Sequence, residues 1–261
     1  MLYYNQKKFK GVIVEFKFLQ NPSVIKLFDL FESENKKLYI VGGAVRNSLL
    51  GEQTNDIDFA TSTKPDDVLK ILQHDDIEVD LKGIRYGTIS AMINNEKFDI
   101  TTFRKDCYAR GSRFPEIICS KKIRDDFVRR DFTVNAIYVD RIGRTIDLGG
   151  GLNDLENGLL KFIINPRKSV YFDPLRILRY FRFCSLYFYN NFDEASLRVC
   201  ISKFPRIRKT LPKKKIKYEL SKMLDSKGFE IILDIWRKND IICNIEDCIE
   251  EVKIEMGKHD E

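Results

Sequence analysis

The stretch Leu38–Ala60, LYIVGGAVRNSLLGEQTNDIDFA, constrains the fold of this chain more than any other. An apolar run leads into Gly42-Gly43, an amphipathic segment follows, and alternation at period two begins at Asp56, so the pattern predicts a strand, a glycine turn, a short helix and a second strand. Residues two apart in a strand point to the same face, so Asp56 and Asp58 are expected to project together. Two neighbouring carboxylates repel each other unless a cation lies between them.

The acidic pair and the glycine pair together predict nucleotide chemistry. Mg²⁺ is usually bound in proteins by one or two carboxylates together with substrate phosphates. Gly42 and Gly43 let a phosphate approach the backbone, and the helix start behind them favours an anion. The glycine pair or the acidic pair alone is weak evidence, because a glycine pair is most often an ordinary turn and an isolated Asp-x-Asp is seldom a metal site. Both pairs in one short stretch are much more specific.

A third carboxylate follows on the next predicted hairpin. Asn94-Asn95 is typical of a hairpin turn, and Glu96–Phe103 is the expected return strand, on which Asp99 and Thr101 share one face. A strand that brought Asp99 beside the acidic pair would complete a two-metal site. The alternative is that Asp99 only faces solvent.

Composition limits the class of protein and its surroundings. The chain has 261 residues, of which 32% are charged and 43% hydrophobic, as in an ordinary soluble protein, and its net charge of +6 permits a nucleic-acid partner without requiring one. Six cysteines without a Cys-x-x-Cys pair or a neighbouring histidine argue against a zinc site and fit a reducing cytoplasm. No apolar run approaches the ~18–20 residues that span a bilayer, and the start lacks a cleavable signal pattern. We therefore expect a cytoplasmic location and no membrane partner.

The letters VGGAVRN, DID and the following AT resemble the class II tRNA nucleotidyltransferase and bacterial poly(A) polymerase family of the polymerase β-type nucleotidyltransferase superfamily. RRDFTVNA at 129–136 and DPLRILRYFRF at 173–183 extend the resemblance to roughly residues 36–240. It implies an α+β fold, with an N-terminal polymerase β-like mixed or antiparallel sheet and flanking helices, followed by an all-α part. The implied domains are a catalytic head (1–150), a helical neck that selects nucleotides and contacts tRNA (151–225) and a truncated remnant of a helical body (226–261).

The resemblance also assigns roles to residues of the head. Asp56 and Asp58 would be catalytic ligands of Mg²⁺, with Asp99 as a third catalytic carboxylate. An arginine suits a triphosphate, because the guanidinium matches its charge and paired oxygens. The expected nucleotide-binding residues of the head are Gly42, Gly43, Arg46, Arg130 and Asn135. Arg110 and Arg113 would belong to a flexible loop that members of the family need to change from adding C to adding A, although a basic surface loop is the simpler interpretation of the pattern alone.

The segment Asp173–Phe183 is the second informative stretch. Asp173 is expected to cap a helix, and Arg176, Arg179 and Arg182 recur at every third position, which on its own predicts a solvated face. Cytosine and adenine both offer an amino donor beside a ring acceptor, so a fixed carboxylate and a fixed guanidinium could select them against uracil and guanine. The resemblance assigns nucleotide binding to all four residues. One departure is Phe172, where the family has a glutamate thought to orient the arginine.

A basic run, Lys203–Lys217, follows the selecting helix. Its eight cations and lack of acids would ordinarily indicate a solvated surface, but at this place in the chain it could hold tRNA phosphates. The expected tRNA-binding residues are Lys213, Lys214 and Lys215.

The predicted function is template-independent addition of CMP and AMP to the tRNA 3′ end from CTP and ATP, by two-metal phosphoryl transfer with release of pyrophosphate. The full-length loop and the GIRYGT turn at 83–88 favour this branch over a partial CC- or A-adding enzyme or a poly(A) polymerase. A non-catalytic RNA-binding subunit is the alternative from another class, and the acidic pair argues against it. Members of the family usually continue further, so a homodimer or a helper protein could grip the tRNA in place of the missing tail.

Overall fold

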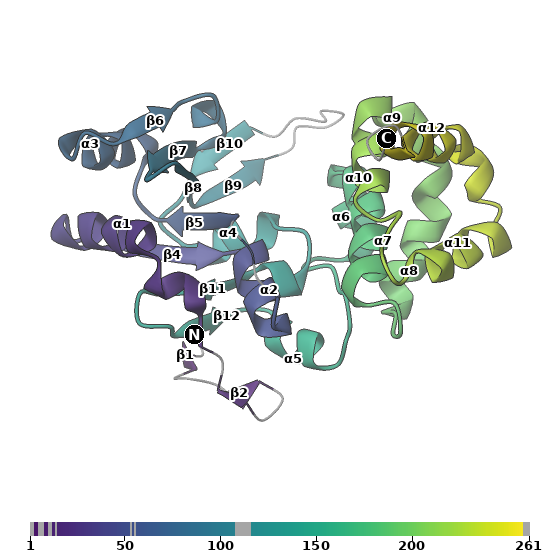
Figure 1. The fold of residues 1–261 in the computed structure, drawn as a ribbon, viewed down its shortest axis with the longest axis horizontal. Helices are drawn as coiled ribbons and strands as arrows, with labels where there is room; N and C mark the ends of the chain where they lie inside the picture. The colour runs from purple at the N-terminus through teal and green to yellow at the C-terminus, as the bar shows by residue number, and fades with distance from the viewer. Residues whose placement is uncertain are drawn as a thin grey trace. The chain divides into compact units, whose positions relative to one another are not determined.

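The computed structural model describes residues 3–4, 8–9, 12–13, 15–52, 54, 56–107 and 116–257 of the chain. They fall into two compact units, residues 1–156 and 157–261 (Figure 1). The boundary follows Glu156, whereas the expected division into 1–150, 151–225 and 226–261 stays a prediction. No helix in the described ranges has the length and apolar character that crossing a membrane requires.

A mixed sheet of eight strands is the framework of the first unit, in the order β1-β12-β11-β4-β5-β8-β7-β6. Neighbouring strands are antiparallel except for β5 and β8, which are parallel. The strands are β1 (Tyr3–Tyr4), β4 (Leu38–Val41), β5 (Ile57–Thr61), β6 (Glu78–Asp80), β7 (Thr88–Ile93), β8 (Glu96–Thr102), β11 (Ile137–Val139) and β12 (Thr145–Asp147). Two small ribbons pair β2 (Lys8–Phe9) with β3 (Val12–Ile13), and β9 (Arg104–Cys107) with β10 (Glu116–Cys119).

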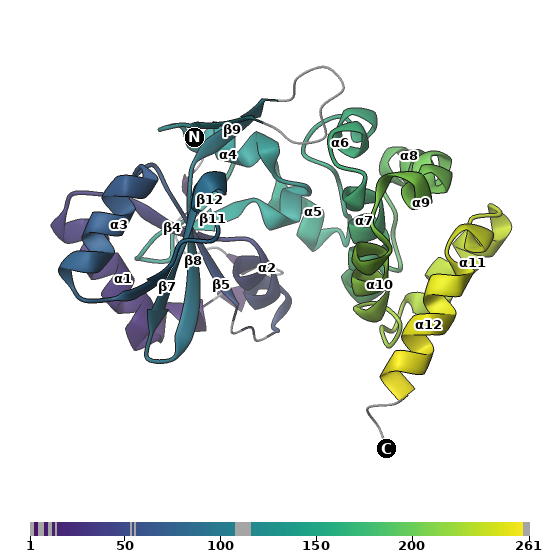
Figure 2. The same ribbon diagram turned by 90° about the horizontal axis from the view of Figure 1, so that it is seen from above.

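Helices cover both faces of this sheet. Helices α1 (Pro22–Ser33) and α3 (Pro65–His74) lie on one face, and α2 (Gly43–Leu50) lies on the other (Figure 2). Phe28 of α1 packs edge-on against Phe59 of β5 at 5.8 Å between ring centroids, so the α1 side holds the main apolar core. Because side chains alternate along β5, Asp58 points to the face that carries α2. The unit also contains α4 (Ile123–Arg129), α5 (Gly151–Glu156) and the 3₁₀ helices η1 (Lys17–Gln20), η2 (Ile84–Tyr86) and η3 (Thr133–Asn135).

Local sequence signals explain where these elements begin and turn. The side chain of Asn21 accepts a hydrogen bond from the Ser23 backbone nitrogen at 2.8 Å and so caps α1, with Pro22 in the first turn. Asn94 and Asn95 have φ angles of 51° and 63°, the left-handed conformation that a two-residue hairpin turn requires. This turn joins β7 to β8 and confirms the predicted hairpin.

Within its described residues the second unit contains helices and no strands. Phe181 and Phe204 pack around the buried Trp236, with ring centroids 5.5 and 5.3 Å from that of the indole. The helices are α6 (Pro166–Phe172), α7 (Leu175–Tyr187), α8 (Glu194–Lys203), η4 (Phe204–Arg206), α9 (Ile207–Thr210), α10 (Lys213–Ser221), α11 (Phe229–Lys238), η5 (Ile242–Asn244) and α12 (Glu246–Gly257). A mixed sheet with helices followed by an all-α part confirms the predicted α+β class.

Candidate active site

The predicted acidic residues gather beside the glycine turn on the α2 face of the sheet. Asp58 and Asp99 are direct partners in the parallel pairing of β5 with β8, and Asp56 immediately precedes β5. Gly42, the residue before α2, has φ +90°, and a Cβ placed on it would lie 3.5 Å from Oδ2 of Asp58. The turn and the acidic strand are therefore neighbours, as the sequence pattern predicted.

The electrostatics of this cluster fit a cation. The pKa of Asp58 is raised to about 6, chiefly by burial and then by the charges of Asp56 and Asp99, while Arg130 and Lys97 act in the opposite direction. A partly buried carboxylate beside two others is an oxygen donor set suited to a hard divalent ion. Within the ranges that the structure describes, no group of three His, Cys, Asp or Glu side chains is arranged to hold a metal ion. In proteins Mg²⁺ is usually held by one or two carboxylates together with oxygens of a substrate.

Asp99 is bonded within its own hairpin. Its Oδ1 accepts a hydrogen bond from the Ser90 hydroxyl at 2.5 Å and lies 3.1 Å from Nζ of Lys97. Both partners come from the same two strands, β7 and β8, and hold the carboxylate in place beside Asp58. The third-carboxylate role of Asp99 stays a prediction.

Arg46 and Asn135, both expected to bind the nucleotide, are in contact with each other. The buried Arg46 donates from Nη1 to Oδ1 of Asn135 at 2.5 Å and from Nη2 to Oδ1 of Asn47 at 2.7 Å. Asn135 in turn donates to Asp131 at 3.1 Å, which fixes its amide. A Cβ on Gly43 would lie 3.7 Å from Nη2 of Arg46, so the guanidinium folds back over the first turn of α2 and leaves positive charge there.

Arg130 belongs to a buried network centred on Asp126, a residue that the sequence analysis missed. Asp126 is fully buried and accepts from Nε of Arg130 at 2.9 Å, from Nη2 of Arg129 at 2.5 Å and from the Tyr138 hydroxyl at 2.7 Å. Burial alone would raise the pKa of Asp126, but Arg130 and Arg129 outweigh it and lower the pKa. The available signal was the position of Asp126 three and four residues before Arg129 and Arg130, the spacing of ion pairs along a helix.

The predicted base-reading residues lie at the start of α7, in the second unit. Oδ1 of Asp173 accepts from the Leu175 backbone nitrogen at 3.0 Å, which confirms that Asp173 caps the helix. Arg176 is buried and donates from Nη1 to the Ser169 hydroxyl of α6 at 2.7 Å. The guanidinium of Arg176 is therefore held in place by a residue of the preceding helix, α6. This chain has Phe172 at the position where the family has a glutamate.

The two later arginines of α7 face the ring of Phe183. The guanidinium carbons of Arg179 and Arg182 lie 5.5 and 4.6 Å from the ring centroid, within cation–π range. Nε of Arg182 also lies 3.2 Å from Oε2 of the buried Glu219 on α10. Both arginines are therefore tied to the helical core.

The remaining predicted residues have different surroundings. Arg110 and Arg113 lie outside the described residues. Lys214 and Lys215 are exposed on α10, whereas Lys213 is paired with carboxylates of α12. The nucleotide-, loop- and tRNA-binding roles of all these residues stay predictions.

A mixed sheet with a parallel strand pair, neighbouring carboxylates on it and a glycine turn leading into a helix define a polymerase β-type nucleotidyltransferase head. Residues 38–161 match the family model for the poly(A) polymerase head domain and belong to that family. The CCA-adding enzyme of Enterococcus faecalis is 34% identical over 187 residues, which cover 71% of this chain and 45% of that protein. Homologues of the chain are thus CCA-adding enzymes of class II.

Solved structures agree with the sequence relatives. The Bacillus stearothermophilus CCA-adding enzyme in complex with CTP superposes with a TM-score of 0.73 and 25% identity, over 83% of this chain and 51% of that one. A tRNA nucleotidyltransferase complexed with a primer tRNA and an incoming ATP analogue gives a TM-score of 0.68 and 25% identity, over 84% of this chain and 62% of that one. The chain spans about half the length of the curated relatives it matches.

Proposed function

We propose that this protein is a template-independent tRNA nucleotidyltransferase that adds CMP and AMP to the tRNA 3′ end from CTP and ATP. The observation that carries the proposal is the pairing of Asp58 with Asp99 on adjacent parallel strands, directly against Gly42. The names of the relatives and the ligands in the titles of the matching structures, CTP, tRNA and an ATP analogue, support the same substrates.

The head residues would bind the triphosphate and the metal. Asp56 and Asp58 would hold Mg²⁺, with Asp99 assisting. When bound, such an ion lowers the pKa of the attacking hydroxyl and neutralises phosphate charge. Gly42 and Gly43 leave room for phosphate oxygens at the start of α2, and Arg46 and Arg130 add positive charge. The 3′-oxygen of the RNA forms the new bond to the α-phosphorus as the bond to pyrophosphate breaks, and the hydroxyl proton leaves to solvent.

Base choice would fall to the start of α7. Asp173 accepts from the amino group of cytosine or adenine, and Arg176 donates to the ring acceptor. Uracil and guanine present an oxygen acceptor instead, so a carboxylate would face an oxygen and the mismatch would cost about 1–3 kcal/mol. Arg179 and Arg182 support the helix that carries both groups.

Extension of tRNA transcripts with one nucleotide triphosphate at a time tests the proposal. We expect addition of CMP to transcripts that lack the whole CCA end and to transcripts that end in its first C. We expect addition of AMP only to transcripts that end in CC. A partial enzyme would extend only some of these ends, and a poly(A) polymerase would add AMP to all of them. Mass measurement in solution with and without tRNA tests the predicted homodimer or helper protein.

Substitution of the acidic pair gives the decisive control. Asp56→Asn/Asp58→Asn is expected to abolish incorporation. The control Asp66→Asn/Asp76→Asn removes the same charge from two exposed positions of the first unit, and we expect this variant to keep the incorporation activity. Incorporation at the wild-type rate by the Asp56/Asp58 variant would refute the proposed chemistry.

A further inference from the structure

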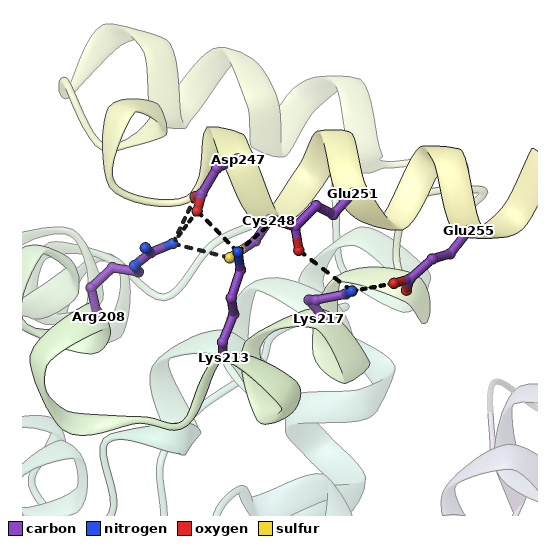
Figure 3. A network of polar contacts seen from close by, with 7 residues as sticks. All are labelled: Arg208, Lys213, Lys217, Asp247, Cys248, Glu251 and Glu255. Atoms are coloured by element: carbon purple, nitrogen blue, oxygen red, sulfur yellow. Dashed lines mark hydrogen bonds and ion pairs between the residues drawn. The ribbon is translucent and has the colours of Figure 1, made fainter.

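A row of carboxylates on α12 covers part of the basic run in the second unit (Figure 3). We name Asp247, Glu251 and Glu255 the carboxylate ladder, and Arg208, Lys213 and Lys217 the cation row. Successive members of the ladder are four residues apart and so lie on one face of α12, about 6 Å from one another along the axis. Lys213 and Lys217 have the same spacing on α10, so the two rows lie in register.

The contacts between the rows are closely spaced and shared. Nη1 of Arg208 lies 2.6 and 2.8 Å from the two oxygens of Asp247, and Nζ of Lys213 lies 3.4 Å from Asp247 and 2.5 Å from Glu251. Lys217 pairs with Glu255 and lies 3.5 Å from Glu251. Each lysine therefore has two carboxylates around its ammonium group.

Apolar side chains, and not the ladder, hold α12 in place. Cys248, Ile249 and Val252 of this helix are buried, whereas Glu251 and Glu255 keep 42% and 59% of their side-chain surface exposed. Exposed ion pairs of this kind contribute little to stability. The lysines can therefore exchange carboxylates for other anions while α12 stays packed.

The surface around the rows suits single-stranded or end-frayed RNA. A groove of about 520 Å³ between α10 and α12 is lined by Lys213, Lys214, Lys217, Tyr218 and Glu251, among others. Tyr218 is 58% exposed and has Nζ of Lys222 at 5.6 Å from its ring centroid, and Lys214 and Lys215 add exposed charge beside it. Exposed rings among cations are typical of surfaces that stack with the bases of single-stranded RNA. Lysines interleaved with an exposed aromatic ring match RNA better than an acidic protein surface.

We propose that the carboxylate ladder competes with RNA phosphates for the cation row, so that α12 acts as an internal RNA mimic that weakens non-specific RNA binding by α10. This inference rests on the proposed function in taking RNA as the partner. The competition depends on ionic strength and not on pH near neutrality, because the hydrogen bond from Arg208 lowers the pKa of Asp247 to about 2 and that from Lys213 lowers the pKa of Glu251.

Binding of a fluorescently labelled tRNA transcript over a range of salt concentrations tests the competition. Glu251→Gln/Glu255→Gln removes both carboxylate partners of Lys217 and leaves Lys213 with Asp247 alone. We expect about tenfold tighter binding near 0.1 M salt and a log–log salt slope steeper by roughly 1–2, since each new phosphate contact adds about 0.7–0.9. The control Glu246→Gln/Glu250→Gln removes the same net charge from exposed positions of the same helix. It is expected to leave the slope at its wild-type value.

Adding Lys213→Gln/Lys217→Gln to the Glu251/Glu255 variant should remove the gain in affinity. Equal slopes and affinities for the two glutamate double variants, with thermal unfolding like that of the wild type, would overturn the inference. That result leaves the proposed function standing if the wild type extends tRNA. Conversely, a steeper salt slope for the Glu251/Glu255 variant, together with no tRNA extension by the wild type, would support the competition by the carboxylate ladder and refute the proposed enzymatic function.

Discussion

A Cβ placed on Gly42 would lie 3.5 Å from Oδ2 of Asp58, so the glycine turn and the acidic strand form one site although the two residues are separated by a whole helix. Asp58 and Asp99 come together because β5 and β8 pair in parallel. The sheet therefore brings three chain segments to one place: the turn before α2, the start of β5 and the middle of β8. Each of them contributes a residue type suited to phosphate or cation binding.

Replacement of Gly42 by alanine tests the turn. The φ of +90° strains any L side chain, whereas 3.5 Å is an ordinary contact distance, so we expect a loss of about 1–2 kcal/mol in unfolding free energy from the backbone. The added methyl group also narrows the approach of a phosphate. Calorimetric titration with CTP should show at least tenfold weaker binding.

Gly51→Ala is the matched control for this change. Gly51 has φ +80° and ψ 14°, in the left-handed helical region, and open space around its Cβ position, so alanine there also meets positive-φ strain but lies away from the acidic strand. We expect a destabilisation no larger than that of Gly42→Ala, with CTP affinity like that of the wild type. Equal losses of affinity in the two variants would show that strain, and not the site, is responsible.

Local patterns predicted most of this site, and long-range contacts account for what was missed. Period-two alternation and the Asn94-Asn95 turn were enough to place Asp58 and Asp99 on strands. The bond between Arg46 and Asn135 joins residues 89 positions apart, which no local pattern reveals. For the same reason Lys213 was expected to be available for tRNA, although its partner Glu251 lies 38 positions further along the chain.

Removal of the Asp58 charge should stabilise the metal-free protein. Its folded pKa of about 6 lies above the ordinary value of 3.8, so the native state binds more protons between these pH values. Stability of the wild type therefore falls as pH rises from about 4 to 6 and is level above that. Asp58→Asn should lack this fall and gain about 3 kcal/mol at pH 7 in EDTA.

Urea unfolding at pH 4.5 and pH 7 measures this gain. Asp66→Asn, an exposed aspartate on α3, serves as the control and should follow the wild type. Added Mg²⁺ should stabilise the wild type and leave Asp58→Asn unaffected. If Asp58→Asn were less stable than the wild type at pH 7 without metal, the buried charge of Asp58 would not destabilise the metal-free protein as predicted.

Asp126→Asn should be strongly destabilising. It keeps the shape of the side chain but leaves Arg129 and Arg130 without their buried counter-charge, a change that typically costs about 3–5 kcal/mol. Because the pKa of Asp126 is lowered, its stabilisation is present at neutral pH and is lost as pH falls below about 4. The difference in unfolding free energy between wild type and variant should therefore shrink in acid.

Asp125→Asn provides the comparison for Asp126. Asp125 accepts from the Ser120 hydroxyl and lies 3.7 Å from the half-exposed Lys105, so its loss should cost less than about 1 kcal/mol. Chemical unfolding at pH 7 separates the two variants. Similar losses from both would mean that the buried network around Asp126 is not the main support of α4.

Ser169→Ala tests whether the orientation of Arg176 governs nucleotide choice. The Ser169 hydroxyl accepts from Nη1 of Arg176 at 2.7 Å in a buried setting, so its removal should cost about 1 kcal/mol in stability and free the guanidinium. Under the proposed base-reading role, the ratio of kcat/KM for CTP over UTP should fall several-fold. Ser185→Ala is the control, because Ser185 is also buried but donates to the Arg182 carbonyl. The Ser185→Ala variant should lose comparable stability and keep the ratio of kcat/KM for CTP over UTP.

An unchanged CTP-over-UTP ratio in Ser169→Ala would mean that Arg176 is held by its other contacts. Ser169 would then not take the place of the glutamate that the family has at position 172.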